Sequence, residues 1–152
     1  MLLLLAAWQD LRTMHIADAV SLAIVAAFAL WASSGLARGT ISLPTVGVAL
    51  ACAAVMFGAG AAAFAAGALG GGDVKLLAAT SLFAGPGLMS DFLLVTTLVG
   101  GALGVAVLAG APIGPLAPAA GATIRTRLRG SLPYGPAIAA GGLWVAASLS
   151  LQ

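Results

Sequence analysis

The chain of 152 residues is 62% hydrophobic and only 7% charged, whereas soluble domains carry about 25% charged residues. It has too few polar groups to cover a water-exposed surface, so the composition excludes an ordinary soluble domain and predicts a membrane protein. The formal net charge of +2 is too small to indicate nucleic-acid binding. Cys52 stands alone, which excludes an internal disulfide and a CxxC zinc site.

Six apolar segments predict an all-α, polytopic bundle of about six transmembrane helices, which forms one membrane-embedded domain over residues 1–152. The first segment, residues 1–8, is shorter than the roughly 20 residues that span a bilayer. It lacks the basic start of a signal peptide, so we interpret it as the end of a membrane helix that is either truncated or begins upstream. The other segments are residues 17–34, 44–69, 76–84, 92–109 and 137–151.

The positions of the six basic residues predict the orientation in the membrane. With the N-terminus outside, only Arg38 falls on the external side. Cytosolic loops are enriched in Lys and Arg, so an N-out, C-out topology is expected. Three closely spaced arginines near the end of the chain are interpreted as a topology anchor that faces anionic lipid. The residues placed on the cytosolic side are Arg12, Lys75, Arg125, Arg127 and Arg129.

The chain has only four carboxylates, and acidic side chains near membrane depth are costly and usually functional. Asp91 is interpreted as a solvated helix start. Asp10 ends the first segment and Asp73 begins the fourth, so the predicted topology places both at the cytosolic face. Two carboxylates from different helices at one depth are what aspartic proteolysis requires. One carboxyl group donates a proton to the peptide carbonyl, and the other accepts a proton from water.

Taken singly, each of these two carboxylates has a structural alternative. Asp10 is also explained as a helix-end charge beside Arg12, and Asp73 as a helix N-cap. Their joint placement beside the glycines of residues 70–72 favours the functional interpretation. Each glycine costs about 1 kcal/mol relative to Ala in a helix interior, so we expect the backbone to be unwound here. Unwound backbone at membrane depth has to be satisfied by protein or water, so we expect it to line a water-filled cleft. A phosphate-binding loop is excluded, because the chain has no GxxxxGK[ST] motif.

Three segments of the sequence resemble the prepilin peptidases, bacterial intramembrane aspartic proteases of the GxGD type. Residues 70–76, Gly-Gly-Gly-Asp-Val-Lys-Leu, resemble the GxGDxKL motif of that family. Residues 10–18 are similar to its first-aspartate segment, in which an Asp precedes a basic stretch and an Ile-Pro-Asn. Residues 132–139, Leu-Pro-Tyr-Gly-Pro-Ala-Ile-Ala, resemble its late Pro-aromatic-Gly-Pro segment. GxGD alone is weak, but the three motifs in order cover nearly the whole chain.

The resemblance implies that Asp10 and Asp73 are the catalytic pair, without a metal or another cofactor. It also implies a prepilin or pseudopilin substrate, cleaved between its basic leader and its hydrophobic helix at the cytosolic face of the bacterial inner membrane. Residues expected to support the site or bind substrate are Gly70, Gly71, Gly72, Lys75, Pro133, Tyr134, Gly135, Pro136 and Asp18.

Larger members of the family add a methyltransferase region with CxxC pairs, for which this chain has neither the length nor the cysteines. Methylation is therefore not expected. The small size resembles the tight-adherence (Flp) pilus subfamily.

Three residues of these motifs keep two interpretations. Asp18 stands where the family has Asn, and it is either a contact for a basic residue of the substrate or the N-cap of the second helix; we favour the cap. Lys75 either lowers the pKa of the carboxylate pair or binds substrate carbonyls, or it extends its amine to the membrane interface, which we favour. Tyr134 either lines the cleft or is an interfacial aromatic residue.

Outside these motifs, His15 lacks partners for a metal site. Gly100 and Gly104 have the spacing of a dimer face, but packing within the chain is favoured, and a homo-oligomer is left open. The alternative function is a non-catalytic small transporter or secretion-apparatus scaffold, which explains the helices but not the joint placement of Asp10, Asp73 and the glycines.

Overall fold

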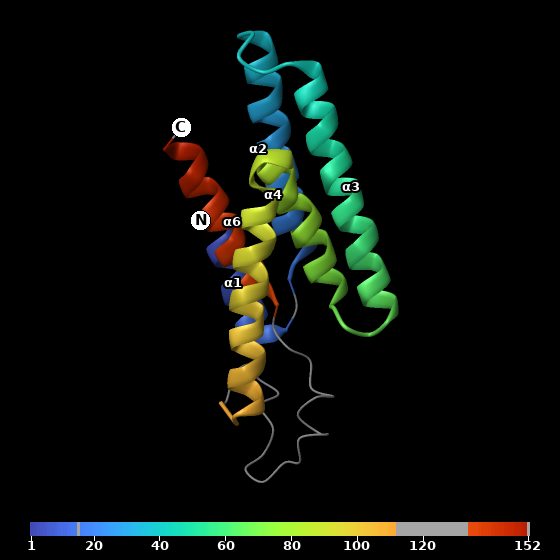
Figure 1. The fold of residues 1–152 in the computed structure, drawn as a ribbon, viewed down its shortest axis with the longest axis vertical. Coiled ribbons are helices and arrows are strands. Elements are labelled where there is room, and N and C mark those ends of the chain that lie inside the picture. The colour runs from blue at the N-terminus through green and yellow to red at the C-terminus, as the bar shows by residue number, and fades with distance from the viewer. Residues whose placement is uncertain (15, 112–133, 152) are drawn as a thin grey trace.

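The computed structural model describes residues 1–14, 16–111 and 134–151. Within these ranges the ordered elements are all helices and no strand is present, which confirms the expected all-α class. Figure 1 shows α3 along one side of the molecule, joined to α2 at its upper end, with α2 and α4 in the middle and α1 and α6 on the opposite side. The helices are α1 (Leu2–Thr13), α2 (Asp18–Ala37), α3 (Leu43–Ala65), α4 (Gly71–Leu108) and α6 (Gly135–Ser150).

The connection between α2 and α3 shows how local sequence sets the helix ends. Gly39, with φ of 70°, adopts the left-handed conformation that glycine favours and turns the chain after α2. Ser42 then caps α3, because its side-chain oxygen accepts a hydrogen bond from the Thr45 N–H at 3.4 Å. Pro44 follows in the first turn, where its missing N–H costs nothing.

Helix α4 is broken at Gly85, whose φ of 51° and ψ of −164° are not helical. Pro86 follows and removes a backbone donor at the same place. In Figure 1 the first part of α4 rises from the lower end of α3, and the part after the break runs back down toward the lower end of the molecule. The two apolar segments expected at residues 76–84 and 92–109 therefore lie on either side of this break.

Three of the described helices, α2, α3 and α4, are long and apolar enough to cross a membrane. Helix α6 is apolar but has only 16 residues, fewer than the roughly 20 that a perpendicular crossing needs. Helix α1 is shorter still, with 12 residues. The membrane class follows from these apolar helices, while the number of six spans and the N-out orientation stay predictions.

Two apolar clusters hold the helices together. The larger cluster joins α1, α2, α4 and α6, with Ala6, Ile24, Phe92 and Ile138 among its buried residues. In the smaller cluster, the rings of Phe28 on α2 and Phe83 on α4 meet edge to face, with centroids 5.3 Å apart. In lipid, such close contacts rather than exclusion of water drive helix association.

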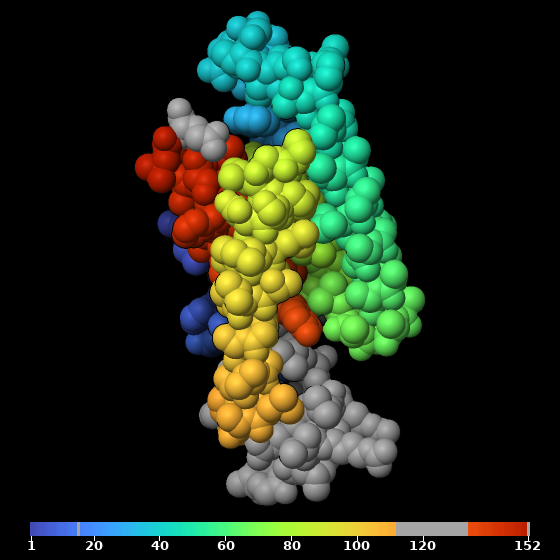
Figure 2. Space-filling model, viewed as in Figure 1, coloured from blue at the N-terminus to red at the C-terminus, as the bar shows by residue number. Residues whose placement is uncertain are grey.

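Large apolar side chains also cover the outside of the bundle. Leu30 on α2, Val55 on α3 and Leu98 on α4 are each more than half exposed. Figure 2 shows α3 along one flank of the molecule, with its outer face uncovered by other helices. An apolar outer surface of this kind fits hydrocarbon rather than water as the surroundings.

Candidate active site

Asp10 lies in the last turn of α1 and is only 4% exposed. Its Oδ2 atom accepts a 2.7 Å hydrogen bond from the backbone N–H of Gly135, the first residue of α6. The free N–H groups at the start of a helix favour negative charge. The N-terminus of α6 therefore holds the Asp10 carboxylate in place and stabilises its ionised form.

Gly135 has to be glycine for this contact to form. A Cβ atom at this position would lie 2.7 Å from both Cβ and Oδ2 of Asp10, far inside the contact distance of about 3.5–4.0 Å between carbon atoms. The sequence motif included Gly135 as a supporting residue, but nothing in the sequence indicated that its backbone N–H would be the donor to Asp10.

Asp73 lies in the first turn of α4 and is 6% exposed. Its Oδ2 atom accepts a hydrogen bond from the Gly70 N–H at 3.3 Å, so the side chain reaches back to the residue that precedes the helix. Its Oδ1 atom is buried and has no hydrogen-bond partner among the described residues. Asp73 thus contributes to the helix start, but the N-cap is Gly70, so the structural alternative of Asp73 as N-cap is wrong.

The two carboxylates line one cavity of about 330 Å³ and are close enough to interact electrostatically. The structure thus brings together two residues that are 63 positions apart in the sequence (73 − 10). The other residues that line the cavity are Met14, Ile16, Asp18, Gly70, Gly71, Gly72 and Lys75.

The three glycines differ in what they do. A Cβ on Gly70 would lie 2.8 Å from Oδ2 of Asp73, and one on Gly72 would lie 3.2 Å from Cβ of Ile16. At Gly71 the nearest atom would be 3.6 Å away, which is an ordinary contact. Gly71 and Gly72 are helical, so the expectation of unwound backbone is wrong for them. Of the two, Gly72 permits a close approach, to Ile16.

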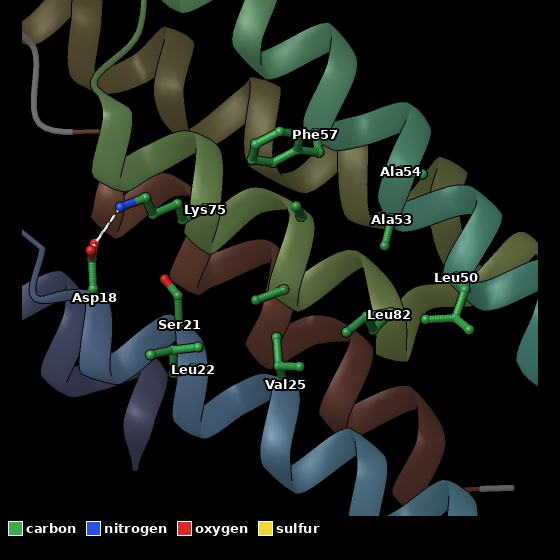
Figure 3. A pocket seen from close by; sticks show the side chains of 12 residues that line it. Asp18, Ser21, Leu22, Val25, Leu50, Ala53, Ala54, Phe57, Lys75 and Leu82 are labelled. Carbon is green, nitrogen blue, oxygen red and sulfur yellow. Dashed lines mark hydrogen bonds and ion pairs between the residues drawn. The ribbon is translucent and has the colours of Figure 1, made fainter.

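Asp18 and Lys75 form an ion pair at the edge of the cavity. The Lys75 Nζ atom lies 2.7 Å and 2.8 Å from the two carboxylate oxygens of Asp18. The same two residues also line an apolar groove between α2, α3 and α4, and Figure 3 shows them at its end. The N-cap of α2 is Ala17, without a side-chain cap, so the favoured role of Asp18 as N-cap is wrong. Its carboxylate reaches Lys75 instead of the α2 backbone.

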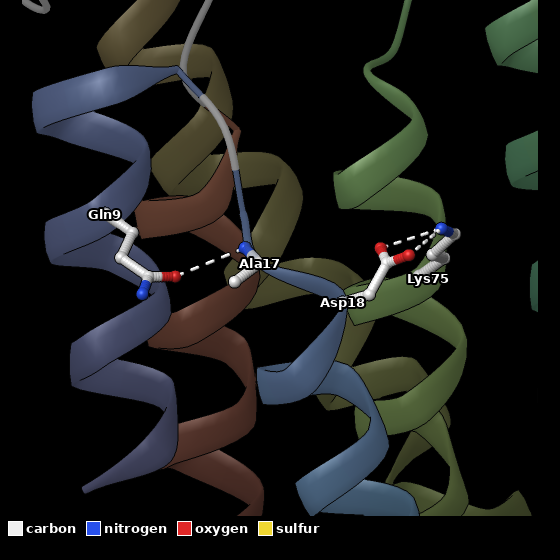
Figure 4. Close-up of polar contacts among 4 residues, drawn as sticks. All are labelled: Gln9, Ala17, Asp18 and Lys75. Atoms are coloured by element: carbon white, nitrogen blue, oxygen red, sulfur yellow. Dashed lines mark hydrogen bonds and ion pairs between the residues drawn. The ribbon is translucent and has the colours of Figure 1, made fainter.

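Gln9 is a supporting residue that the sequence did not single out. Its Oε1 atom accepts a hydrogen bond from the Ala17 N–H at 3.3 Å, and Figure 4 shows this contact beside the ion pair of Asp18 and Lys75. Gln9 precedes Asp10 and so joins the end of α1 to the start of α2. A polar residue next to a candidate catalytic carboxylate, in a helix that is otherwise mostly apolar, was the signal available in the sequence.

The late motif contributes to the site through Gly135 rather than as a whole. Pro136 occupies the first turn of α6, where its fixed φ suits the helix start. Tyr134 does not line the carboxylate cavity; it lines a separate one of about 520 Å³ between α4 and α6. Five residues that the sequence singled out lie outside the described residues. They are His15, Arg125, Arg127, Arg129 and Pro133.

Two other sequence predictions concern α4. A Cβ on Gly100 would meet Ala137 at 3.5 Å and Tyr134 at 3.6 Å, so Gly100 packs within the chain against α6, as favoured. Asp91 is exposed on α4, which confirms that its carboxylate is solvated. It lies six residues after the break at Gly85 rather than at a helix start.

These features define a small helical membrane protein with a buried pair of carboxylates at one end of the bundle. Comparison with protein-family models gives the identity: the model of the type IV leader peptidase family matches residues 1–105. Because this match covers more than half of the chain, the protein belongs to the type IV leader peptidase family. Neither the curated proteins nor the solved structures gave a match.

Family membership confirms the resemblance to the prepilin peptidases and indicates a membrane protease that acts on leader peptides. The matched range contains Asp10, Asp18, Asp73 and Lys75, and it ends before α6. Gly135, the donor to Asp10, therefore lies outside the part of the chain that the family model covers.

Proposed function

We propose that this protein is an aspartic endopeptidase that removes the basic leader from prepilins or pseudopilins at the cytosolic face of the bacterial inner membrane. The observation that carries the proposal is the shared cavity of Asp10 and Asp73, two buried carboxylates from different helices. The proposed substrate belongs to Flp pilus biogenesis, following the resemblance of the sequence to the tight-adherence (Flp) pilus subfamily.

The two carboxylates differ in a way that supports distinct roles. Asp10 accepts a short hydrogen bond from a helix N-terminus, which favours its ionised form. Asp73 is buried beside that negative charge, and one of its oxygens has no hydrogen-bond partner in the part of the chain that the structure describes. Two close carboxylates in such a site cannot both ionise readily, and they share one proton. We therefore assign the proton to Asp73 and the charge to Asp10.

In the proposed reaction, Asp10 takes a proton from water while the water oxygen attacks the carbonyl carbon of the scissile peptide. Asp73 donates its proton to the carbonyl oxygen, which gives a neutral tetrahedral intermediate. The C–N bond then breaks: one hydroxyl proton of the intermediate returns to Asp73, and the amine leaves with the proton that Asp10 holds. Both carboxyl groups end in their starting states, so no cofactor takes part.

The distribution of the described basic residues supports the cytosolic location of the site. Arg12 in the last turn of α1 and Lys75 in the first part of α4 are both near the cavity end. Arg38 follows the opposite end of α2. Since basic residues are enriched on the cytosolic side of membrane proteins, this arrangement favours a cavity that opens toward the cytosol.

The test is coexpression with a candidate Flp prepilin, followed by mass spectrometry of the pilin N-terminus. The wild type should remove the leader. Asp10→Asn and Asp73→Asn should each abolish cleavage, while Asp91→Asn, a matched change at an exposed carboxylate, should cleave normally. Cleavage retained in either of the first two variants would refute the assigned pair. No cleavage by the wild type of any prepilin encoded near the gene would favour the scaffold alternative.

A further inference from the structure

The ion pair of Asp18 and Lys75 lies where two different cavities meet. Both residues line the carboxylate cavity and also one end of the apolar groove between α2, α3 and α4, which has a volume of about 490 Å³. Figure 3 shows the pair at one end of the groove, with Leu22, Val25 and Phe57 along its walls. A chain that lies in the groove and continues to Asp10 and Asp73 has to pass this ion pair.

The pair contributes little as a structural link. The side chains of Lys75 and Asp18 are 49% and 64% exposed, and ion pairs this exposed add little to stability. Lys75 also lies near the N-terminus of α4, where the helix dipole disfavours a cation. Separation of the two charges is therefore easy when another cation is available to Asp18.

The charges around the cavity favour a cationic partner. Three carboxyl groups line it, and with the proton assigned to Asp73, Asp10 and Asp18 carry negative charge. Lys75 is the one basic residue among the described residues that line it. Arg12 does not line the cavity, and its guanidinium lies 4.2 Å from the centre of the Trp8 ring. A basic side chain that displaces Lys75 from Asp18 would find an acidic site at the edge of the cavity.

The groove matches the other half of such a substrate. Apart from the ion pair, the residues that line it are apolar or small, and Leu22 is 66% exposed there. From Asp18 to Val25 the groove follows α2 for seven residues (25 − 18), which is about 10 Å, or two helical turns. An apolar helix of the substrate fits this position, with its basic leader toward Asp18.

We propose that Asp18 is the specificity-determining residue for the leader: it exchanges Lys75 for a basic residue of the substrate, while the apolar groove holds the start of the substrate helix. The proposal rests on the proposed function, because the occupant is the leader peptidase substrate. The exchange directs the basic leader past Asp18, and the peptide bond between leader and helix then lies beside Asp10 and Asp73.

The experiment measures peptide binding to the Asp10→Asn/Asp73→Asn variant in detergent, so that the result does not depend on cleavage. The probe is a fluorescent synthetic peptide with a lysine-containing leader before an apolar helix, compared with a peptide that has glutamates in place of the lysines. We expect tighter binding of the lysine peptide. Asp18→Asn should weaken its binding about two- to fivefold, and Asp18→Lys should reverse the preference. Asp91→Lys, the control for net charge, should leave the preference unchanged.

Two outcomes of the charge experiment would overturn the role of Asp18. One is an unchanged preference in Asp18→Lys, and the other is the same effect from Asp91→Lys. If Asp18→Lys does not accumulate in the membrane, Asp18→Asn provides the test, and unchanged binding of the lysine peptide to that variant would overturn the role of Asp18. In the active enzyme, Asp18→Asn should raise KM with little change in kcat, whereas a structural role would lower the amount of folded enzyme instead.

The groove is tested with a matched pair of substitutions on α2. Leu22→Trp fills the groove and should weaken binding of the full peptide but not of a peptide that ends at the leader. Leu30→Trp, at an exposed position that does not line the groove, should weaken neither. Unchanged binding of the full peptide to Leu22→Trp would show that the substrate helix does not lie in the groove, and would overturn this part of the proposal.

Discussion

Gly135→Ala adds a single methyl group beside Asp10, and the structure predicts that this small change strongly slows leader cleavage. The new Cβ would lie 2.7 Å from Cβ and Oδ2 of Asp10 and 2.9 Å from its Cγ. Ordinary contacts are about 3.5–4.0 Å, so the two groups have to separate by about 1 Å. The hydrogen bond from the Gly135 N–H, now 2.7 Å long, would then lengthen to about 3.7 Å, beyond hydrogen-bonding distance.

Two consequences of this separation differ in size. Overpacking of this kind costs about 1–3 kcal/mol of stability, which corresponds to a fall in Tm of several degrees. A displacement of about 1 Å in a catalytic group costs about a hundredfold in rate. We therefore expect Gly135→Ala to fold with modestly lower stability and to cleave the leader about a hundredfold more slowly.

The matched control is Gly142→Ala on the same helix. Its Cβ would meet Cγ2 of Thr80 at 2.6 Å and Cδ1 of Leu3 at 2.8 Å, so the crowding is similar but does not touch Asp10. The assay compares initial rates of leader removal, per amount of folded enzyme, with thermal unfolding followed by circular dichroism in detergent. Gly142→Ala should lose stability but keep most of its activity. Equal cleavage rates in the two variants would refute the role assigned to the Gly135 contact.

Two further predictions concern glycines that the structure distinguishes. Gly70→Ala should slow leader cleavage about tenfold or more, because its Cβ would lie 2.8 Å from Oδ2 of Asp73. The control, Gly71→Ala, should cleave nearly as fast as the wild type. Equal cleavage rates for the two variants would contradict this prediction. Gly85→Ala should lower the free energy of unfolding by about 1–3 kcal/mol, because φ of 51° and ψ of −164° suit only glycine. Gly87→Ala, with no atom within 4 Å of the new Cβ, should unfold like the wild type, and similar losses in both would remove the strain argument.

The sequence predicted the helical membrane class and the shared location of Asp10 and Asp73, because charges are rare in this chain and each has to be accommodated. With only four carboxylates, their order along the apolar segments already placed two of them at one face. The sequence did not predict that Gly71 and Gly72 are helical. The propensity of glycine disfavours a helix, but at Gly72 the close approach to Ile16 requires glycine. Nothing in the structure explains the glycine at position 71.

The pairing of Asp18 with Lys75 was missed for a different reason. An Asp at the start of a helix usually caps it or interacts with the helix dipole, and both alternatives are local. The observed partner is 57 residues away, and only the packing of α2 against α4 brings the two charges together. Local preferences do not determine such contacts.

The same reasoning applies to the chemistry at Asp10. Its donor is a backbone N–H, which every residue except proline has, so no residue type indicates it in the sequence. The contact joins residues that are 125 positions apart, and it requires α6 to begin at Gly135 beside the last turn of α1. Asp10 is bound by a helix N-terminus, whereas Asp73 has an oxygen without a partner among the described residues. This difference between the two carboxylates is thus a property of the packed bundle. The motifs supply two equivalent acids, and the position of α6 makes them unequal.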